Sequence, residues 1–540
     1  MKKIYFLVAI IVLGGVLRFL KLGEIPNGTT PDEATYIYNA YSIFLTQHSI
    51  TGAFLPFSFN VFNSFSPVPI YIIAPFVGLI DLTLFAGRFP FALLGTASIL
   101  LVFLITHKLF RNHNIALLSA LILAISPWHI QISKIAYDGA FALFFYLLGI
   151  YIFLKMKDSG NILWSVPAFF LGFYSYHGTK LFLLCFIPLL LFTYREELSR
   201  RKKEIFVFLI GMIFIGLSFL YVGKVQEVTR QNVLISNNMH EVGKVVDSER
   251  YANTAPTLLK NLLSNKILVS LRIARENYLH AFSPEYLFLR GETGYNEKVY
   301  GIMNRGAMYI IELPLILLGI LYLLKIKKQV RSFLLLGLLL APLPSAFTID
   351  QSYGMRSIMM LPFLSIIVGC GIYAFFSQIK RMKKILYYLS AAIFIFLYGF
   401  LVTGYLYQFY FRYSVYASEV WFHSTKDVAA YIKEQKSNYA EILIVDSGGI
   451  IMPYALYNKV DPLLAQSAHE SDFPKKIENV SIIKSCINTH KEKFDPQKHV
   501  PSNSLYIAPA DCHKEATKSP IHTIVEVGEP LHTIWNVYEN

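Results

Sequence analysis

Long runs of apolar residues recur from Ile4 to about residue 408 of this 540-residue chain. The runs are rich in Leu, Ile and Phe, and many approach the roughly 20 residues that an α-helix needs to cross the hydrocarbon core of a bilayer. The composition agrees, because only 16% of the residues are charged, whereas a soluble protein of this size carries about a quarter. The pattern predicts a polytopic α-helical membrane protein.

We expect about eleven transmembrane helices. They cover residues 4–20, 88–106, 115–131, 139–155, 162–177, 180–194, 205–222, 307–324, 332–348, 357–376 and 385–406. Lys and Arg residues cluster after the even-numbered spans, and cytoplasmic loops carry an excess of such residues. This predicts a multi-pass protein of the plasma membrane with a cytoplasmic N-terminus and external loops at 21–87, 132–138, 223–306 and 349–356. The net charge of +14 therefore reports topology and does not indicate nucleic acid.

After Phe409 the sequence takes on the composition of an ordinary soluble protein. A helical pattern at 419–436 precedes strand-like segments at 442–445, 505–507, 523–527 and 533–538. We expect a membrane module, 1–408, followed by a small soluble exoplasmic α/β domain, 409–540. Cys486 and Cys512 lie in this second region, and they could pair if it is exoplasmic. The sequence leaves that pairing open.

Two adjacent carboxylates, Asp32 and Glu33, follow the first apolar run by about a dozen residues. Acidic side chains beside a membrane cost desolvation free energy, so a functional interpretation is a general base at the mouth of a membrane-embedded site. The alternative is a helix N-terminus, with Thr30 or Asp32 as the N-cap and the acids in the first turn.

Other ionisable residues also gather at the predicted outer ends of the spans. Carboxylates there can deprotonate an acceptor hydroxyl, and basic side chains can hold a phosphate leaving group. The alternative is that long basic side chains at span ends simply extend to the interface. The set is Asp32, Glu33, Arg88, His129, Lys134, Asp138, His177, Lys180, His280, Glu285, Arg305, Asp350 and Arg356. The chain has no P-loop and no zinc-ligand spacing, so nucleotide hydrolysis and zinc chemistry are unsupported.

Six short motifs, in this order and at these topological positions, resemble the GT-C superfamily of glycosyltransferases. They are Pro31-Asp32-Glu33-Ala34, the segment 86–95, the segment 126–138, Tyr174-Ser175-Tyr176-His177, Phe282-Ser283-Pro284-Glu285 and Gly354-Met355-Arg356-Ser357. The similarity is to bacterial relatives of the protein O-mannosyltransferases and of the lipid A aminoarabinose transferase. One departure is Ser66-Pro67-Val68-Pro69, where some relatives carry a Lys-Pro-Pro whose lysine contacts the donor phosphate.

The resemblance implies inverting transfer of a sugar from a polyprenyl-phosphate donor to an acceptor outside the membrane. Asp32 would be the general base, with Glu33 and Asp138 completing the catalytic set. The implied donor-phosphate ligands are Arg356, Lys134, His129 and Arg88, and the implied acceptor or substrate contacts are Tyr36, His177, His280 and Glu285. No metal or other cofactor is expected.

The donor sugar and the acceptor, which could be protein, lipid or glycan, stay open. A transporter or flippase for a lipid-linked sugar is the alternative function. Such a protein would place ionisable residues near the bilayer midplane, whereas the middle positions of the predicted spans are nearly all apolar.

Overall fold

The computed structural model describes residues 2–158, 160–225, 233–381, 383–447, 449–487, 493–513, 516–528 and 532–540. Contacts divide the chain into two compact units. Unit 1 comprises Met1–Leu20, Phe91–Ser133 and Asp138–Leu406, and unit 2 comprises Lys21–Pro90, Lys134–Tyr137 and Tyr407–Asn540. Unit 2 thus joins the first predicted external loop to the C-terminal region. Its last segment begins next to the predicted boundary after residue 408.

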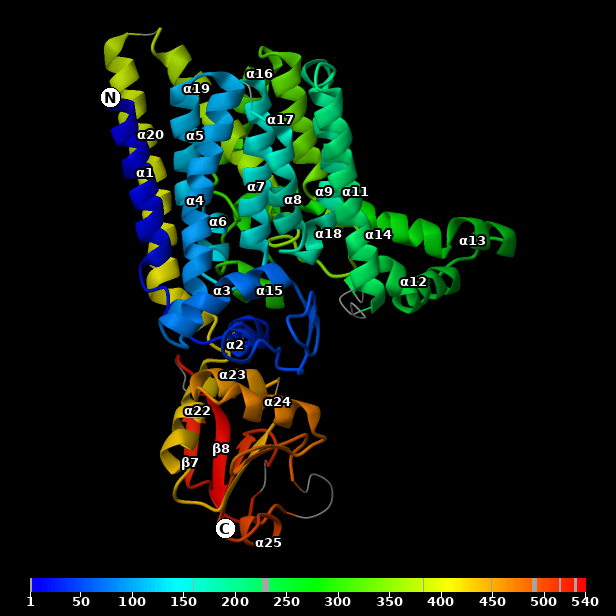
Figure 1. Ribbon diagram of the computed structural model, residues 1–540, viewed down its shortest axis with the longest axis vertical. Helices are drawn as coiled ribbons and strands as arrows, with labels where there is room; N and C mark the ends of the chain where they lie inside the picture. The colour runs from blue at the N-terminus through cyan, green and yellow to red at the C-terminus, as the bar shows by residue number, and fades with distance from the viewer. Residues whose placement is uncertain are drawn as a thin grey trace. The chain divides into compact units, whose positions relative to one another are not determined.

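Unit 1 is a bundle of apolar helices that run largely alongside one another (Figure 1). Its long helices are α1 (Lys2–Phe19), α4 (Leu84–Phe110, of which residues 84–90 belong to unit 2), α5 (His113–Ile125), α7 (Gly139–Leu154), α8 (Ser165–Phe173), α9 (Lys180–Thr193), α11 (Lys202–Val225), α16 (Glu312–Leu324), α17 (Lys328–Leu340), α19 (Met360–Ile379) and α20 (Lys384–Tyr407). The remaining helices of the unit are α6 (Pro127–Ile132), α10 (Arg195–Leu198), α12 (Met239–Tyr251), α13 (Thr257–Leu263), α14 (Lys266–His280), α15 (Tyr295–Tyr300) and α18 (Leu343–Ala346).

Each of the eleven predicted spans falls on one of these long helices. Within the described residues, six helical segments are long and apolar enough to cross a membrane: Leu84–Phe110, Gly139–Lys157, Lys202–Lys224, Lys328–Ala346, Met360–Ile379 and Lys384–Tyr416. Further apolar helices are shorter than a full span. The prediction of a helical, polytopic membrane protein is therefore confirmed, and the number of spans stays a prediction.

Helix α19 lies at the centre of unit 1, because its residues Met360 to Ile372 are all buried. Small residues allow close packing around it, as at many helix contacts in membranes. A Cβ atom on Gly371 would collide with the carbonyl oxygen of Leu315 in α16, and one on Gly319 would collide with that of Ile367. By contrast, only 11% of the most apolar window of α11 is buried, which is typical of a helix that faces lipid.

Unit 2 is organised around α2 (Pro31–Thr46), whose residues Glu33 to Ala40 are all buried. It contacts α3 (Pro67–Leu79), α23 (Ile451–Tyr457) and α24 (Pro462–Glu470). The hydroxyl of Tyr38 donates to the carbonyl oxygen of Val460 at 2.8 Å. The first loop that was predicted to be external is therefore folded, with a short hairpin of β1 (Phe59–Asn60) and β2 (Ser64–Phe65) between its helices.

The C-terminal region of unit 2 contains a six-stranded mixed sheet in the order β4-β5-β3-β6-β8-β7. Its strands are β3 (Glu441–Val445), β4 (Lys475–Ile477), β5 (Val480–Ile483), β6 (Ser504–Pro509), β7 (His522–Val525) and β8 (Thr533–Glu539), and α21 (Tyr413–Tyr416), α22 (His423–Gln435) and α25 (Pro496–His499) complete the unit. The central strand β3 runs parallel to β5 and β6, and the other pairs are antiparallel. The four predicted strands coincide with β3, β6, β7 and β8.

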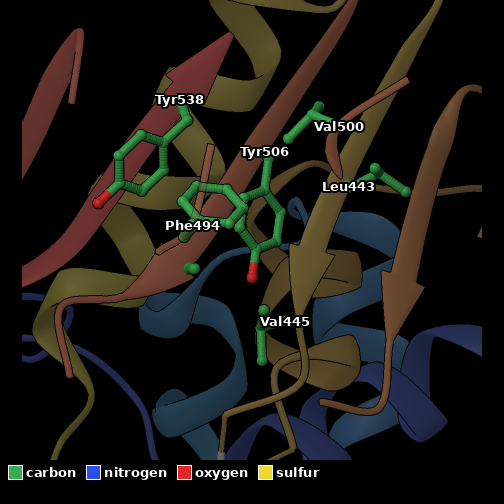
Figure 2. Packing of buried hydrophobic residues seen from close by; sticks show 7 residues of the cluster. Leu443, Val445, Phe494, Val500, Tyr506 and Tyr538 are labelled. Carbon is green, nitrogen blue, oxygen red and sulfur yellow. The ribbon is translucent and has the colours of Figure 1, made fainter. Parts of the chain in front are cut away.

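An apolar cluster packs against this sheet (Figure 2). Its members are Leu443, Val445, Phe494, Val500, Tyr506, Ala508 and Tyr538. A disulfide between Cys486 and Cys512 lies against the cluster, which answers the question that the sequence left open. Large aromatic side chains and a cross-link therefore stabilise a core that is small.

Candidate active site

The N-terminus of α2 carries the two adjacent carboxylates. Thr30 is the N-cap, and its hydroxyl oxygen accepts a hydrogen bond from the backbone N–H of Glu33 at 3.2 Å. The same hydroxyl lies 2.7 Å from that of Tyr137. Pro31 occupies the first helical position, where its missing N–H costs nothing. The helix-start interpretation of this segment is thus confirmed, and it does not exclude catalysis by Asp32.

Glu33 is held in a fully buried ion pair with Arg88, one of the predicted phosphate ligands. The Arg88 Nε and Nη2 atoms donate to the two carboxylate oxygens at 2.8 and 2.7 Å, and both side chains have no exposed surface. The backbone N–H of Ala136 adds a third bond to the carboxylate, at 2.8 Å. Glu33 therefore ties together segments around residues 33, 88 and 136.

Arg88 has no N–H group left for a phosphate. Its other donors go to the backbone carbonyl oxygens of Leu22, Pro26 and Gly28, at 3.3, 2.9 and 2.8 Å. Since a guanidinium has five N–H groups, these bonds and the two to Glu33 use them all. The ring of Trp421 covers the guanidinium, with its centroid 5.8 Å from Cζ. This geometry argues against the expected phosphate contact and assigns Arg88 to holding the loop.

Asp32 differs from Glu33 although the two are neighbours. Its side chain is partly exposed on the first turn of α2, whereas that of Glu33 is buried. A helix N-terminus favours a carboxylate there. The rigid network around Glu33 and Arg88 fixes the backbone from which Asp32 projects. The two acids therefore separate into one that holds the turn together and one whose side chain is partly exposed.

Two other predicted residues lie in unit 2. Lys134 is fully buried, and its ammonium group lies 5.7 and 5.3 Å from the ring centroids of Phe409 and Tyr410. Such distances allow cation–π attraction. Tyr36 is also buried and packs edge-on against Phe65, with centroids 5.1 Å apart.

In unit 1, Asp138 precedes α7 and is 1% exposed. It interacts electrostatically with Lys180. The ammonium group of Lys180 lies 3.0 Å from Nδ1 of His177 and 3.9 Å from the ring centroid of Phe219. The structure therefore brings together two of the predicted residues, Asp138 and His177, through a lysine that the sequence had placed in the wider ionisable set.

Arg356 forms a second arginine–carboxylate pair, in the loop before α19. Its guanidinium donates through both Nη atoms to Asp350, with one distance of 2.8 Å, and to the hydroxyl of Thr348 at 3.0 Å. The Arg356 side chain is 13% exposed and that of Asp350 is 42% exposed. An arginine held in this way presents the fork geometry that suits phosphate as well as carboxylate.

Glu292 is a buried acid in the same neighbourhood that the sequence analysis did not single out. Its carboxylate accepts the backbone N–H groups of Tyr353, at 2.7 Å, and Gly354. Burial raises its pKa to about 7, although those two N–H groups act in the opposite direction. Glu292 thus fixes the backbone two residues before Arg356. In the sequence, Glu292 is marked only by its position between two glycines, Gly291 and Gly294. In the structure both glycines have positive φ.

A small cavity adjoins Glu292 within unit 1, with a volume of ≈ 20 Å³. Trp128, Tyr286 and Arg305 contribute to its wall. Among the described residues, the Glu292 Oε2 atom and the Tyr286 hydroxyl have no hydrogen-bond partner. The volume suits about one water molecule.

The remaining predicted residues lie elsewhere. His129 is 1% exposed, and its Nδ1 atom lies 2.5 Å from Nη2 of Arg18, within the helix bundle. His280 stacks on the ring of Tyr353, with centroids 4.8 Å apart. Glu285 pairs with Arg290 at 3.4 Å on an exposed surface. Within the described ranges, no group of three or more His, Cys, Asp or Glu side chains could hold a metal ion.

Known proteins resemble this chain in sequence and in fold. The family described as dolichyl-phosphate-mannose-protein mannosyltransferase matches residues 64–220. The structure is similar to that of ArnT from Cupriavidus metallidurans in the apo state, with a TM-score of 0.53 and 11% identity over 99% of this chain and 98% of that one. No curated protein sequence gives a significant match.

Two weaker structural similarities were also found. ArnT from the same organism, bound to undecaprenyl phosphate, has a TM-score of 0.49 at 11% identity and covers 98% of this chain and 97% of that one. The apo oligosaccharyltransferase of Archaeoglobus fulgidus has a TM-score of 0.45 at 14% identity and covers 91% of this chain. The chain spans 62% of the length of that enzyme.

The helical bundle, its apolar spans and its similarity to ArnT define a polytopic membrane protein with a GT-C fold. Residues 64–220 match the mannosyltransferase family in sequence, and the chain as a whole is similar in fold to ArnT. The resemblance seen in the short motifs is therefore confirmed.

Proposed function

We propose that this protein transfers a sugar from a polyprenyl-phosphate donor to an acceptor on the outer face of the membrane. The observation that carries the proposal is the turn at the start of α2, where Asp32 is partly exposed above the buried Glu33–Arg88 pair. A general base needs a defined position and access to the acceptor proton. Asp32 has both properties, whereas Glu33 has only the first.

Asp32 takes a proton from the acceptor, whose freed oxygen or nitrogen attacks the anomeric carbon of the sugar. The bond to the polyprenyl phosphate breaks on the opposite side, so the configuration inverts. Arg356 contacts the leaving phosphate, because its guanidinium is held as a fork by a carboxylate that is itself half-exposed. The family that matches residues 64–220 is described as dolichyl-phosphate-mannose-protein mannosyltransferase, which supports a donor of this class.

The orientation in the membrane is part of the proposal. The basic clusters favour a cytoplasmic N-terminus and an external C-terminal region. The Cys486–Cys512 disulfide supports the external position, because disulfides persist in oxidising compartments.

The test is sugar transfer from a panel of radiolabelled polyprenyl-phosphate sugars in membranes that contain the wild type, Asp32→Asn or Asp81→Asn. Asp32→Asn keeps the shape of the side chain and removes the base, so transfer should fall by about 10²- to 10⁴-fold. Asp81→Asn is the matched control, because Asp81 is an exposed carboxylate of the same loop. It should retain wild-type transfer.

Equal transfer by all three proteins would remove Asp32 from the mechanism and direct attention to Asp138. If no donor supports transfer by the folded wild type, an assay of lipid-linked sugar flipping tests the transporter alternative. Circular dichroism of the purified variants establishes that each is folded.

A further inference from the structure

Three helices of unit 1, α12 to α14, form an arm that is attached at the end of a candidate membrane span. The Asn277 side chain of α14 donates to the carbonyl oxygen of Thr348 at 2.7 Å, and the Tyr278 hydroxyl donates to that of Leu339 at 2.9 Å. Leu339 lies in the last turn of α17, and Thr348 follows the span Lys328–Ala346 by two residues. The end of a spanning helix lies at a membrane face, so the arm is attached at that face.

The arm runs across the direction of the long helices instead of along it (Figure 1). Its inner side is a small apolar cluster, formed by Ile235, Val242, Val246 and Val269. Helices attached at a membrane face and directed across the bundle lie along the plane of the interface. An interfacial helix lies in this plane, whereas a spanning helix crosses it.

The outer side of α14 is apolar and exposed. Ile267 is 72% exposed and Leu271 is 58% exposed, and both lie opposite the buried Val269. Helix α13 has no buried residue, and four of its seven residues are leucines: Leu258, Leu259, Leu262 and Leu263. An apolar surface of this extent marks a site of interaction.

Basic side chains accompany these leucines. Between residues 257 and 280 there are four Lys and Arg residues, of which Arg272 pairs with Glu249 and Arg275 pairs with Glu276; the other two are Lys260 and Lys266. Leucine-rich helices with Lys and Arg at their polar side bind the boundary between head groups and acyl chains, most strongly where the lipids are anionic. The basic residues and the apolar surface both fit a membrane interface that contains anionic lipid.

We propose that the outer surface of α13 and α14 is a membrane anchor that docks on a bilayer interface containing anionic lipid. Through the hydrogen bond from Asn277 to Thr348, the arm then fixes the loop before α19 relative to the bilayer surface. This proposal depends on the membrane position of the bundle and is independent of the proposed reaction.

The test uses the full-length protein in lipid nanodiscs, with the two free cysteines, Cys185 and Cys370, replaced by alanine. Nitroxide labels are placed at Leu262→Cys and Leu271→Cys on the proposed surface, and at Glu241→Cys as the matched control. Glu241 lies on α12 with its side chain 52% exposed. Electron paramagnetic resonance then measures collisions of each label with oxygen, which concentrates in the bilayer, and with a water-soluble nickel complex.

In nanodiscs that contain phosphatidylglycerol, the labels at 262 and 271 should show an oxygen-to-nickel collision ratio several-fold higher than the label at 241. The difference should shrink when all lipids are zwitterionic. Equal ratios at the three positions would overturn the proposal. Dipolar broadening between labels at 262 would also overturn it, because it would identify a second copy of the chain as the occupant.

Discussion

Arg88 and Arg356 each hold a carboxylate through two hydrogen bonds, but their surroundings differ. The Arg88–Glu33 pair has no exposed surface, whereas the side chains of Arg356 and Asp350 are 13% and 42% exposed. All five N–H groups of Arg88 are bonded within unit 2. A buried pair with every donor used defines the backbone around it. The Arg356–Asp350 pair is partly exposed through Asp350, so under the proposed function Arg356 can exchange this carboxylate for a phosphate, whereas Arg88 cannot.

The largest expected effect follows from breaking the buried pair. Arg88→Met leaves the buried Glu33 carboxylate with only the Ala136 N–H as a donor, and it leaves three backbone carbonyl groups without the Arg88 donors. Loss of one member of a buried ion pair destabilises a protein by about 3–5 kcal/mol. Thermal unfolding of the purified protein in detergent, followed by intrinsic fluorescence, measures this loss. Arg290→Met, at a position where the side chain is 70% exposed, is the matched control, and an unchanged melting temperature for Arg88→Met would contradict the assignment.

A second prediction concerns how protein stability depends on pH through Glu292, which holds the backbone just before Arg356. Burial raises the pKa of Glu292 from 4.5 to about 7, so the folded protein binds this proton more tightly than the unfolded chain does. Stability from this group is complete below pH 4.5, decreases as the pH rises to about 7, and then stays constant. At 1.36 kcal/mol per pKa unit, the change is at most about 3 kcal/mol.

Glu292→Gln should abolish this dependence, since the amide oxygen can still accept the N–H groups of Tyr353 and Gly354. The measurement is the melting temperature of the wild type and the variant between pH 4.5 and 8. Glu276→Gln is the control, because that side chain is 60% exposed. Parallel pH curves for the wild type and Glu292→Gln would show that Glu292 does not carry the effect.

The sequence predicted the membrane bundle because apolar runs and basic clusters are local patterns. It also predicted the strands of the C-terminal sheet from runs such as Ile442 to Val445. It could not separate Arg88 from Arg356, since both are single arginines at the ends of apolar runs. Which N–H groups are used depends on carbonyl oxygens brought together by the fold. Glu292 was missed for the same reason, because its burial comes from long-range packing.

A third prediction concerns the Arg356–Asp350 pair and depends on the proposed function. Arg356→Lys replaces the planar fork by a single ammonium group, which cannot make two parallel bonds to a phosphate. Loss of a charge-assisted hydrogen bond costs about 1.5–3 kcal/mol, so KM for the polyprenyl-phosphate donor should rise by roughly 10- to 150-fold with a smaller change in stability. Initial rates at varied donor concentration measure it. A large loss of stability with an unchanged KM would make Arg356 a structural residue like Arg88.

The smallest effect is expected at an exposed ion pair in unit 2. The ammonium group of Lys459 lies 2.7 Å from both carboxylate oxygens of Asp81, and the two side chains are about half exposed, at 50% and 49%. The hydrogen bond from Lys459 lowers the pKa of Asp81, so any stabilisation is present at neutral pH and is lost as the pH falls through the range in which aspartate titrates.

Exposed pairs contribute about 0–1 kcal/mol, so Asp81→Asn should change the melting temperature only slightly. The change should disappear at about 1 M salt, where the screening length is about 3 Å. Melting curves of both proteins at low and high salt measure it. Because its geometry is as good as that of the Arg88–Glu33 pair, a loss as large as that of Arg88→Met would show that contact geometry, and not burial, sets the strength of ion pairs in this protein.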